Sequence, residues 1–225
     1  MKEQWCIPPE ASGEFVWRME DVLEVYRRPY DPRRPQVCLD EKSVQLLGDV
    51  RAPLPMGPGR PARQDSEYQR HGTVNIFLAV EPLANWRTIQ VTERRTKKDF
   101  ALFLKDLVDR RYAQAEVVVL VMDNLNTHSP ASLYEAFEPA EAKRIADKLE
   151  IHHTPKHGSW LDMAEIELSV LGRRLAERLA DRDSLATVCA AVERERNESG
   201  LGIDWRFTAV DARIRLKRLY PSIGA

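Results

Sequence analysis

The chain has 225 residues, a formal net charge of −1, and 43% hydrophobic and 31% charged residues. This length can bury a full hydrophobic core, and the composition excludes a protein dominated by disorder. No apolar segment is long enough to span a membrane. The first residues lack the basic region and apolar run of a secretory signal, so a cytoplasmic protein is expected.

The three cysteines fit that compartment. Cys6, Cys38 and Cys189 are odd in number and widely separated, and their spacing matches no metal site. They are therefore expected to be small, mostly buried thiols.

The near-neutral net charge alone argues against nucleic-acid binding, but the distribution of basic residues is more informative. Each basic cluster taken singly is typical of a solvated surface. Five clusters together leave room for a DNA path if the fold brings them to one side. The clusters are Arg27, Arg28, Arg33 and Arg34; Arg60 and Arg63; Arg94, Arg95, Lys97 and Lys98; Arg173, Arg174 and Arg178; and Arg213, Arg215, Lys217 and Arg218.

The first third of the chain predicts a helix, two short strands and a long loop. Apolar residues recur at helical spacing over residues 14–26. A short apolar run at 37–39 ends at Asp40, and residues 43–47 form a second strand that could pair with it as a hairpin. Prolines and glycines argue against regular structure over residues 48–71, and a loop of this length is usually functional or disordered.

The middle of the chain predicts two further strands, at residues 73–80 and 88–91, and a helix at 99–112. Residues 117–122 are six consecutive apolar residues, which is typical of a strand covered on both faces in a parallel sheet. This run stops at Asp123.

The last third predicts a helix at 139–148, an edge strand at 149–153 and a long helix at 162–179. Two more helices, near residues 185–198 and 211–219, follow them. Strands that come first as a meander and then alternate with helices predict a mixed α/β sheet.

Two predicted strands end in an acidic residue, Asp40 and Asp123. The carboxyl ends of neighbouring strands face the crevice where α/β sheets bind ligands. Each residue alone is also explained as an ordinary turn former after a strand. Two carboxylates side by side repel each other, and a hard divalent cation with oxygen ligands is the usual remedy in a functional site.

A third acidic ligand is expected from the start of the long helix, where Glu165 is the preferred candidate. Its helical face continues through Ser169, Gly172 and Ala176, and such small residues would let that face approach the sheet closely. The alternative is structural, because Asp162 as the N-cap and Glu165 in a capping box would explain both residues without any metal.

Three ordered motifs carry a resemblance to a known family. They are Val37-Cys38-Leu39-Asp40-Glu41, Met122-Asp123-Asn124-Leu125-Asn126-Thr127-His128 and Thr154-Pro155-Lys156-His157-Gly158-Ser159-Trp160-Leu161-Asp162-Met163-Ala164-Glu165. Together they resemble the DDE transposases of bacterial insertion sequences, in the branch related to mariner elements, from near residue 1 to about residue 180.

The resemblance implies a ribonuclease-H-like α/β fold with a mixed five-stranded sheet flanked by helices. In that fold the first Asp lies on the first strand, the second Asp just after the fourth, and the Glu on a following helix. The chain would then comprise an N-terminal helix and linker (1–34), the catalytic domain (35–180) and C-terminal helices packing on it (181–225).

By this resemblance, Asp40, Asp123 and Glu165 are the catalytic carboxylates and hold two Mg²⁺ or Mn²⁺ ions. Asp40 would bridge the ions, and Asp123 and Glu165 would each complete one. Asn124 and His128 belong to the second motif and could position the scissile phosphate or a metal-bound water. A locally hydrogen-bonded residue at a helix start is the alternative for His128.

The sequence departs from the family's pattern in two places. Many relatives carry Asn where Asp162 stands, so the choice of the third carboxylate among Asp162, Glu165 and Glu167 stays open. The interval from Asp123 to Glu165 is longer than the commonest spacing, because residues 131–148 are an extended segment.

Other residues have weaker assignments. His152, His153 and His157 do not have the spacing of a standard zinc site. Trp160 is expected in the core rather than stacked on a base. The residues expected to contact DNA are Arg60, Arg63, Lys97, Lys98, Lys156, Arg173 and Arg174.

The function implied is that of a DNA transposase catalytic domain, which cuts transposon ends and joins them to target DNA. Its expected partners are double-stranded DNA, comprising inverted-repeat ends and target, and a second copy of the chain on DNA, contacted through loop 48–71. The residues before Asp40 are too few for a helix-turn-helix reader of the ends, so a separate polypeptide would supply it. The protein would be cytoplasmic, on the bacterial nucleoid when bound to DNA, with no membrane partner.

Three alternatives remain. A nuclease of the same fold would cut DNA or RNA without strand transfer. An inactive remnant of a transposase would bind DNA without metal-dependent nicking. A metal-free hydrolase with His128 as its base is the third, although no Ser or Cys nucleophile accompanies that residue.

Overall fold

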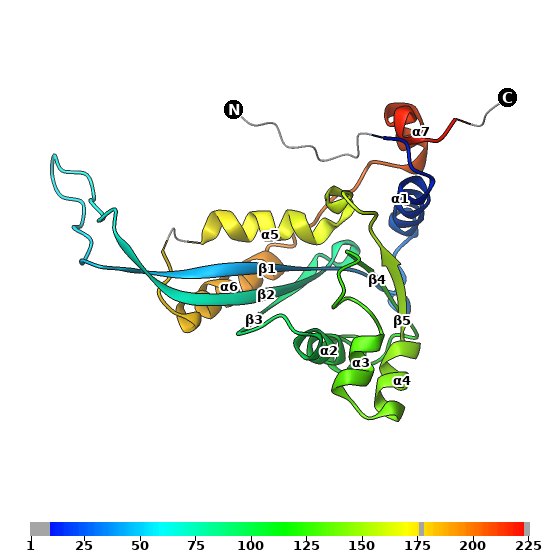
Figure 1. Ribbon diagram of the computed structural model, residues 1–225, viewed down its shortest axis with the longest axis horizontal. Coiled ribbons are helices and arrows are strands. Elements are labelled where there is room, and N and C mark those ends of the chain that lie inside the picture. The colour runs from blue at the N-terminus through cyan, green and yellow to red at the C-terminus, as the bar shows by residue number, and fades with distance from the viewer. Residues whose placement is uncertain (1–9, 176–177, 223–225) are drawn as a thin grey trace.

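The computed structural model describes residues 10–175 and 178–222. Its centre is a five-stranded sheet in the order β3-β2-β1-β4-β5 (Figure 1). The strands are β1 (Gln36–Asp49), β2 (Tyr68–Glu81), β3 (Trp86–Thr92), β4 (Val118–Met122) and β5 (Leu149–His153). The first three form an antiparallel meander, and β4 and β5 run parallel to β1. The expected mixed five-stranded sheet is confirmed.

Helices cover both faces of the sheet (Figure 1). One face carries α1 (Gly13–Tyr26), α5 (Met163–Arg174), α6 (Arg182–Glu198) and α7 (Ala209–Arg215), and the other carries α2 (Lys97–Asp106), α3 (Ala131–Ala136) and α4 (Pro139–Asp147). Cys38 and Val119 belong to the first core, and their strand neighbours Val37 and Leu120 belong to the second. This burial on two faces explains the unbroken apolar run of β4.

β1 is one continuous strand, so the prediction of two short strands joined as a hairpin was wrong. The residues at the predicted turn, 40–42, stay paired with β2, and Ser43 Oγ donates a hydrogen bond to Asn75 Oδ1 at 2.7 Å. The pairing shifts register only farther along, between Gln45 and Leu47. Pairing with a strand distant in sequence therefore overrode the local polarity of this segment.

Residues 50–67 form an arm that projects from the end of β1 and β2 (Figure 1). The expectation of a loop without regular structure was wrong in part. Leu54 pairs with Arg63, and Gly57 pairs with Arg60, in isolated antiparallel bridges. The prolines interrupt the ladder between these bridges, because proline cannot donate to it. The arm carries Arg60 and Arg63, two of the residues expected to contact DNA, exposed and away from the sheet.

Helix boundaries follow local capping and tertiary contacts. Thr96 and Asp99 form a capping box at the start of α2, which passes at its other end into a single π-helical turn, Leu107–Arg111. α5 ends at Arg174, short of the predicted residue 179. The following chain returns to β1, where Leu47 N donates to Leu179 O at 2.9 Å.

The C-terminal helices close over the same face as α1. α6 packs against β3, and Ser12 N donates to Leu219 O at 3.1 Å, which ties the start of α1 to the last described turn. Within residues 10–175 and 178–222, no helix has the length and apolar character needed to cross a membrane.

The thiol and tryptophan predictions are confirmed where the structure describes them. Cys38 and Cys189 are buried and free. Trp160 packs against the core, with its ring edge-on to Phe207 at 5.8 Å. Cys6 lies outside the described residues.

Candidate active site

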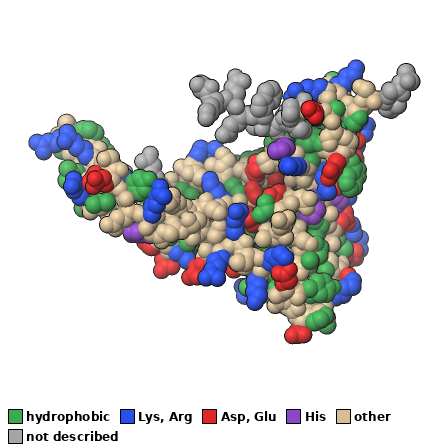
Figure 2. Space-filling model, in the orientation of Figure 1, with side chains coloured by type: hydrophobic (Ala, Val, Ile, Leu, Met, Phe, Trp, Pro, Cys, Tyr) green, Lys and Arg blue, Asp and Glu red, His purple; other side chains and the backbone are tan. Residues whose placement is uncertain are grey.

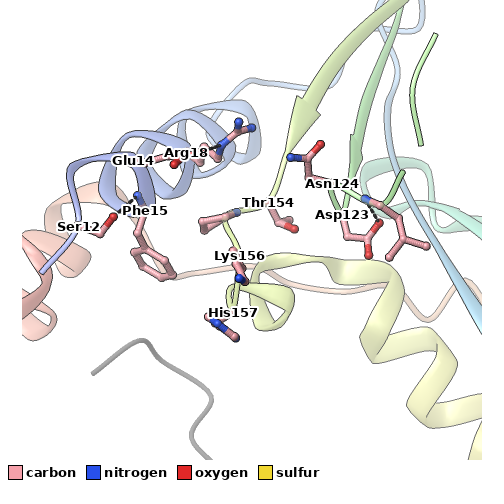
Figure 3. Close-up of a pocket in the computed structure, with 11 residues that line it drawn as sticks. Ser12, Glu14, Phe15, Arg18, Asp123, Asn124, Thr154, Lys156 and His157 are labelled. Carbon is pink, nitrogen blue, oxygen red and sulfur yellow. Dashed lines mark hydrogen bonds and ion pairs between the residues drawn. The ribbon is translucent and has the colours of Figure 1, made fainter. Parts of the chain in front are cut away.

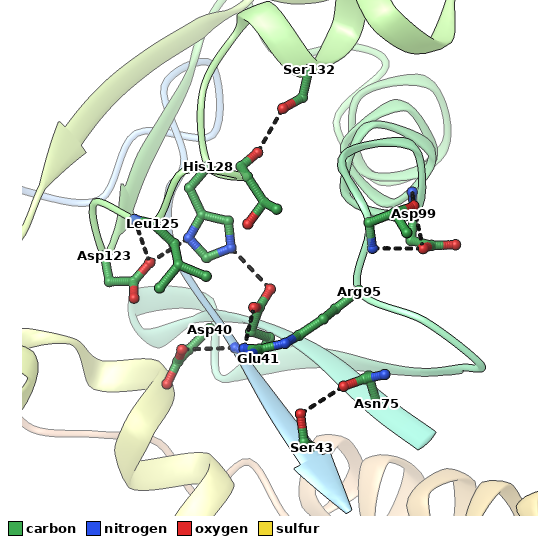
Figure 4. Close-up of polar contacts among 12 residues, drawn as sticks. Asp40, Glu41, Ser43, Asn75, Arg95, Asp99, Asp123, Leu125, His128 and Ser132 are labelled. Atoms are coloured by element: carbon green, nitrogen blue, oxygen red, sulfur yellow. Dashed lines mark hydrogen bonds and ion pairs between the residues drawn. The ribbon is translucent and has the colours of Figure 1, made fainter. Parts of the chain in front are cut away.

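Asp40 and Asp123 lie at the same edge of the sheet, on adjacent parallel strands. Leu39 of β1 is level with Met122 of β4, so the residue that follows each of them is acidic and at the same height. Figure 4 shows both carboxylates on this edge. β4 ends here, at the crevice predicted to bind ligands, whereas β1 continues past Asp40 to Asp49, so the expectation that a strand ends at Asp40 was wrong.

Glu165 comes to this edge from α5. It lies in the first turn of that helix, which packs against β1 and β2. Asp162 is the N-cap, and its Oδ1 accepts from Ala164 N at 2.8 Å. Among the described residues, Glu165 does not complete the capping box that would explain it without metal. The helix is therefore capped by Asp162 alone, which leaves the Glu165 carboxylate for another role.

Glu167, the other alternative for the third carboxylate, lies elsewhere. Its side chain is buried and forms ion pairs with Arg196 of α6 at 2.6 Å and with Arg87 of β3 at 3.5 Å. Two guanidinium groups neutralise it. Glu167 therefore joins α5 to β3 and α6, and its charge is already compensated.

Among the described residues, Asp40 and Asp162 at the sheet edge form no ion pair of this kind. Burial raises the pKa of Asp40 to about 7, and the negative charges of Glu165 and Asp123 add to the shift. Asp162 is also buried, with one carboxyl oxygen unpaired, and burial together with the charge of Asp40 raises its pKa well above the usual value. The site thus gathers carboxyl groups whose charged forms a cation would stabilise.

This donor set fits a divalent cation chemically, because Mg²⁺ and Mn²⁺ prefer carboxylate oxygens. Among the described residues, no three His, Cys, Asp or Glu side chains already have the arrangement that a bound ion requires. The three carboxylates would have to draw together around an ion.

His128 lies behind Asp123, away from solvent (Figure 4). Its Nδ1 donates to Asp123 Oδ1, its Nε2 donates to Glu41 Oε2 at 3.0 Å, and its ring packs on Phe100 at 4.8 Å. Although burial opposes it, these two carboxylates raise the pKa of His128 to about 9. For Asp123, burial acts to raise the pKa. The hydrogen bond from His128 and the charge of that residue outweigh burial, so the pKa of Asp123 is lowered.

A cavity of about 590 Å³ adjoins Asp123 (Figure 3). Asn124 and Lys156 line it from the loops after β4 and β5. Phe15 and Arg18 line it from α1, a contribution that sequence analysis missed. Only the helical spacing of α1 was visible in the sequence, and nothing there showed where the helix would dock.

Lys and Arg side chains are scattered over the surface viewed in Figure 2, including the arm. The residues expected to contact DNA come from separate elements, namely the arm, α2, the loop after β5 and α5. Arg173 and Arg174 are exposed in the last turn of α5, where Arg174 pairs with Glu195. Lys98 is exposed, whereas Lys97 pairs with Glu135.

The three histidines that lack the spacing of a zinc site make separate contacts. His152 bonds Asp21 and Glu150, His153 bonds the Asp123 backbone, and His157 lines the cavity.

The raised pKa of Asp40 predicts how stability depends on pH. Between the ordinary value of 3.8 and about 7, the folded chain binds a proton that the unfolded chain has released. The free energy of unfolding should therefore fall as pH rises through this window, by up to a few kcal/mol. Urea unfolding in the presence of a chelator should show a shallower fall for Asp40→Asn. Asp147→Asn, at an exposed acid of α4, is the control, and identical profiles for both variants would contradict the assignment.

Comparison with known proteins agrees with this architecture. No curated protein matches the chain. The crystal structure of the Mos1 mariner paired end complex with Mn has a TM-score of 0.56 and 18% identity, over 89% of this chain and 62% of that one. The Mos1 strand transfer complex gives 0.57 and 16%, over 89% and 61%. The catalytic domain of Mos1 mariner transposase gives 0.53 and 15%, over 86% and 95%.

At these identities the likeness establishes the fold, which is the ribonuclease-H-like fold of a DDE transposase catalytic domain, as expected. The chain spans about three fifths of the length of the first two Mos1 chains. Residues 35–186, most of the sequence, match the family described as DDE superfamily endonuclease, and the chain therefore belongs to that family.

Proposed function

We propose that this chain is the catalytic domain of a DNA transposase of a bacterial insertion sequence, which cleaves DNA at transposon ends and joins them to target DNA. The observation that carries the proposal is the convergence of Asp40, Asp123 and Glu165, from β1, β4 and α5, at one edge of the sheet. Phosphodiester cleavage needs concentrated negative charge of this kind to hold cations beside a phosphate.

The three carboxylates would hold the two ions. Asp40, which is partly buried and feels the charges of Glu165 and Asp123, would be a ligand of both ions. Asp123 and Glu165 would each be a ligand of one ion. Bound Mg²⁺ or Mn²⁺ would supply activation of the attacking oxygen and stabilisation of the leaving oxygen. Asn124 lines the cavity beside Asp123 and is placed to contact the DNA there.

The similar structures support this function and suggest the partners. Their titles describe a paired end complex with Mn and a strand transfer complex of Mos1. By analogy, this chain would act on double-stranded transposon ends and target DNA as a homodimer. A separate helix-turn-helix polypeptide would read the ends.

The path of the DNA gives a prediction for basic residues. Lys156→Ala and Arg173→Ala should each weaken binding to duplex DNA and lower the slope of log affinity against log salt concentration by about one. Fluorescence anisotropy of a labelled duplex over a salt series measures both quantities. Lys143→Ala removes an exposed lysine of α4, on the opposite part of the molecule, and should leave the slope unchanged. Equal slopes for all three variants would remove Lys156 and Arg173 from the DNA path.

The function itself is tested by nicking of supercoiled plasmid DNA with Mg²⁺ or Mn²⁺, followed by transfer of pre-cleaved ends taken from the DNA that flanks the gene. A transposase does both. Nicking without transfer would indicate a nuclease of the same fold. DNA binding without nicking in either metal would indicate an inactive remnant and would overturn the proposal.

A further inference from the structure

A chain of hydrogen-bonded side chains leads to Asp123 from residues that the proposed reaction does not use directly. It runs from Arg95 in the β3–α2 loop through Glu41 and His128 to Asp123 (Figure 4). Arg95 Nη1 lies 3.0 Å from Glu41 Oε1, and His128 Nε2 lies 3.0 Å from Glu41 Oε2. The other ring nitrogen, Nδ1, bonds Asp123 Oδ1.

Glu41 and His128 are placed to act on other protein groups. The His128 side chain is 0% exposed and that of Glu41 is 4% exposed, so neither can reach DNA in this arrangement. Glu41 follows Asp40 directly in β1, and successive strand residues face opposite sides of the sheet. Glu41 therefore turns toward α2, whereas Asp40 faces α5.

The two carboxylate oxygens of Asp123 have different surroundings. Oδ1 accepts from His128 and also from Leu125 N at 3.2 Å. Oδ2 makes no hydrogen bond with any described residue, which leaves it for a cation. Partial rotation of the carboxylate would break both bonds to Oδ1, while the His128 ring is held by its packing on Phe100 and its bond to Glu41.

We propose that His128, held by Glu41 and Arg95, is a positioning residue that fixes the orientation of the Asp123 carboxylate, with one oxygen bonded to His128 and the other directed at the metal ions; this inference rests on the proposed function. Hydrogen-bond partners of metal ligands orient those ligands, and losing one costs about 10- to 100-fold in metal affinity or activity. The chain also ties β4 to β1, so Asp123 is fixed relative to Asp40.

Two substitutions separate the two bonds of His128. In His128→Asn the amide can replace Nδ1 and keep the bond to Asp123, whereas in His128→Gln it can replace Nε2 and keep only the bond to Glu41. The wild-type chain, these variants, Glu41→Gln and His128→Phe are compared by calorimetric titration with Mn²⁺ in the absence of DNA. Plasmid nicking then gives kcat and KM, and thermal unfolding checks the fold.

His152 provides a matched control. Its Nδ1 lies 2.7 Å from Asp21 and its Nε2 lies 3.0 Å from Glu150, so it also bridges two carboxylates, neither of which belongs to the site. His152→Phe should affect folding without affecting Mn²⁺ affinity.

The expected result is a loss of about 10- to 100-fold in Mn²⁺ affinity and kcat for His128→Phe and His128→Gln, with KM for DNA unchanged. His128→Asn should retain more of both than His128→Gln, and Glu41→Gln should lie between them. If the wild type binds Mn²⁺ and nicks DNA but His128→Phe matches it, the positioning role is overturned and the function stands. An equal loss in His152→Phe would also overturn it. A wild type that neither binds Mn²⁺ nor nicks DNA would overturn the function, and the inference with it.

Discussion

Replacing Glu165 with glutamine is expected to lower the rate of Mn²⁺-dependent DNA nicking about a thousandfold, because a metal-binding charge is worth several kcal/mol in the transition state. The substitution keeps the size of the side chain and its place in the first turn of α5. Asp40→Asn and Asp123→Asn should have effects of the same order. Nicking rates per folded molecule, with the folded fraction measured by circular dichroism, test this.

Two substitutions on the same helix are the controls. Asp162→Asn should retain nicking, because asparagine caps a helix as well as aspartate does. Glu167→Gln should retain nicking per folded molecule, because Glu167 pairs with Arg87 and Arg196. A large loss of nicking in either variant, with none in Glu165→Gln, would assign the role of third carboxylate to the residue replaced in that variant.

Glu167→Ala is expected to have the largest effect on stability, lowering the free energy of unfolding by about 3–5 kcal/mol. The reason is Arg87, whose side chain is 1% exposed and would keep a buried charge without its partner. For a chain of this size, this corresponds to a fall in Tm of roughly 10 °C. Urea unfolding and calorimetry measure the two quantities.

A solvent-exposed ion pair is the control for the buried pair of Glu167. Glu195→Ala removes the partner of Arg174, where both side chains are more than half exposed, and should cost less than about 1 kcal/mol. Replacing Arg87 and Glu167 together with leucine should recover much of the loss, since the most buried charge, Arg87, is then removed and only the more exposed Arg196 is left without its partner. Similar costs for Glu167→Ala and Glu195→Ala would show that the buried pair contributes little.

The sheet was largely predictable because its strands are marked by local patterns. β4 and β5 were found with at most one residue of error, since an unbroken apolar run and a following helix leave few alternatives. β1 was broken wrongly at its polar segment, because pairing with β2 depends on residues far along the chain. The same limit applied to the arm, where bridges such as Leu54 with Arg63 form despite the prolines.

The part of the candidate site that depends on strand pairing was predictable from the sequence. The apolar runs before Asp40 and Asp123 placed both residues at one level of the sheet, and parallel pairing of β1 and β4 accounts for this, although β1 continues past Asp40 to Asp49. The choice of a third acid was not predictable from spacing, because Asp162, Glu165 and Glu167 lie within six residues of one helix start. Their environments come from other elements, and only the fold brings Arg87 and Arg196 to Glu167.

The register of β1 decides more than the packing of the sheet. A slip of one residue against β2 and β4 would turn Glu41 toward α5 and bury Asp40 beside Phe100, because side chains alternate along a strand. Correct folding and chemical competence would then be lost in the same event. The bulge between Gln45 and Leu47 separates the arm from this part of the strand. Insertions or deletions in the arm could therefore accumulate over evolution without shifting the acids out of place.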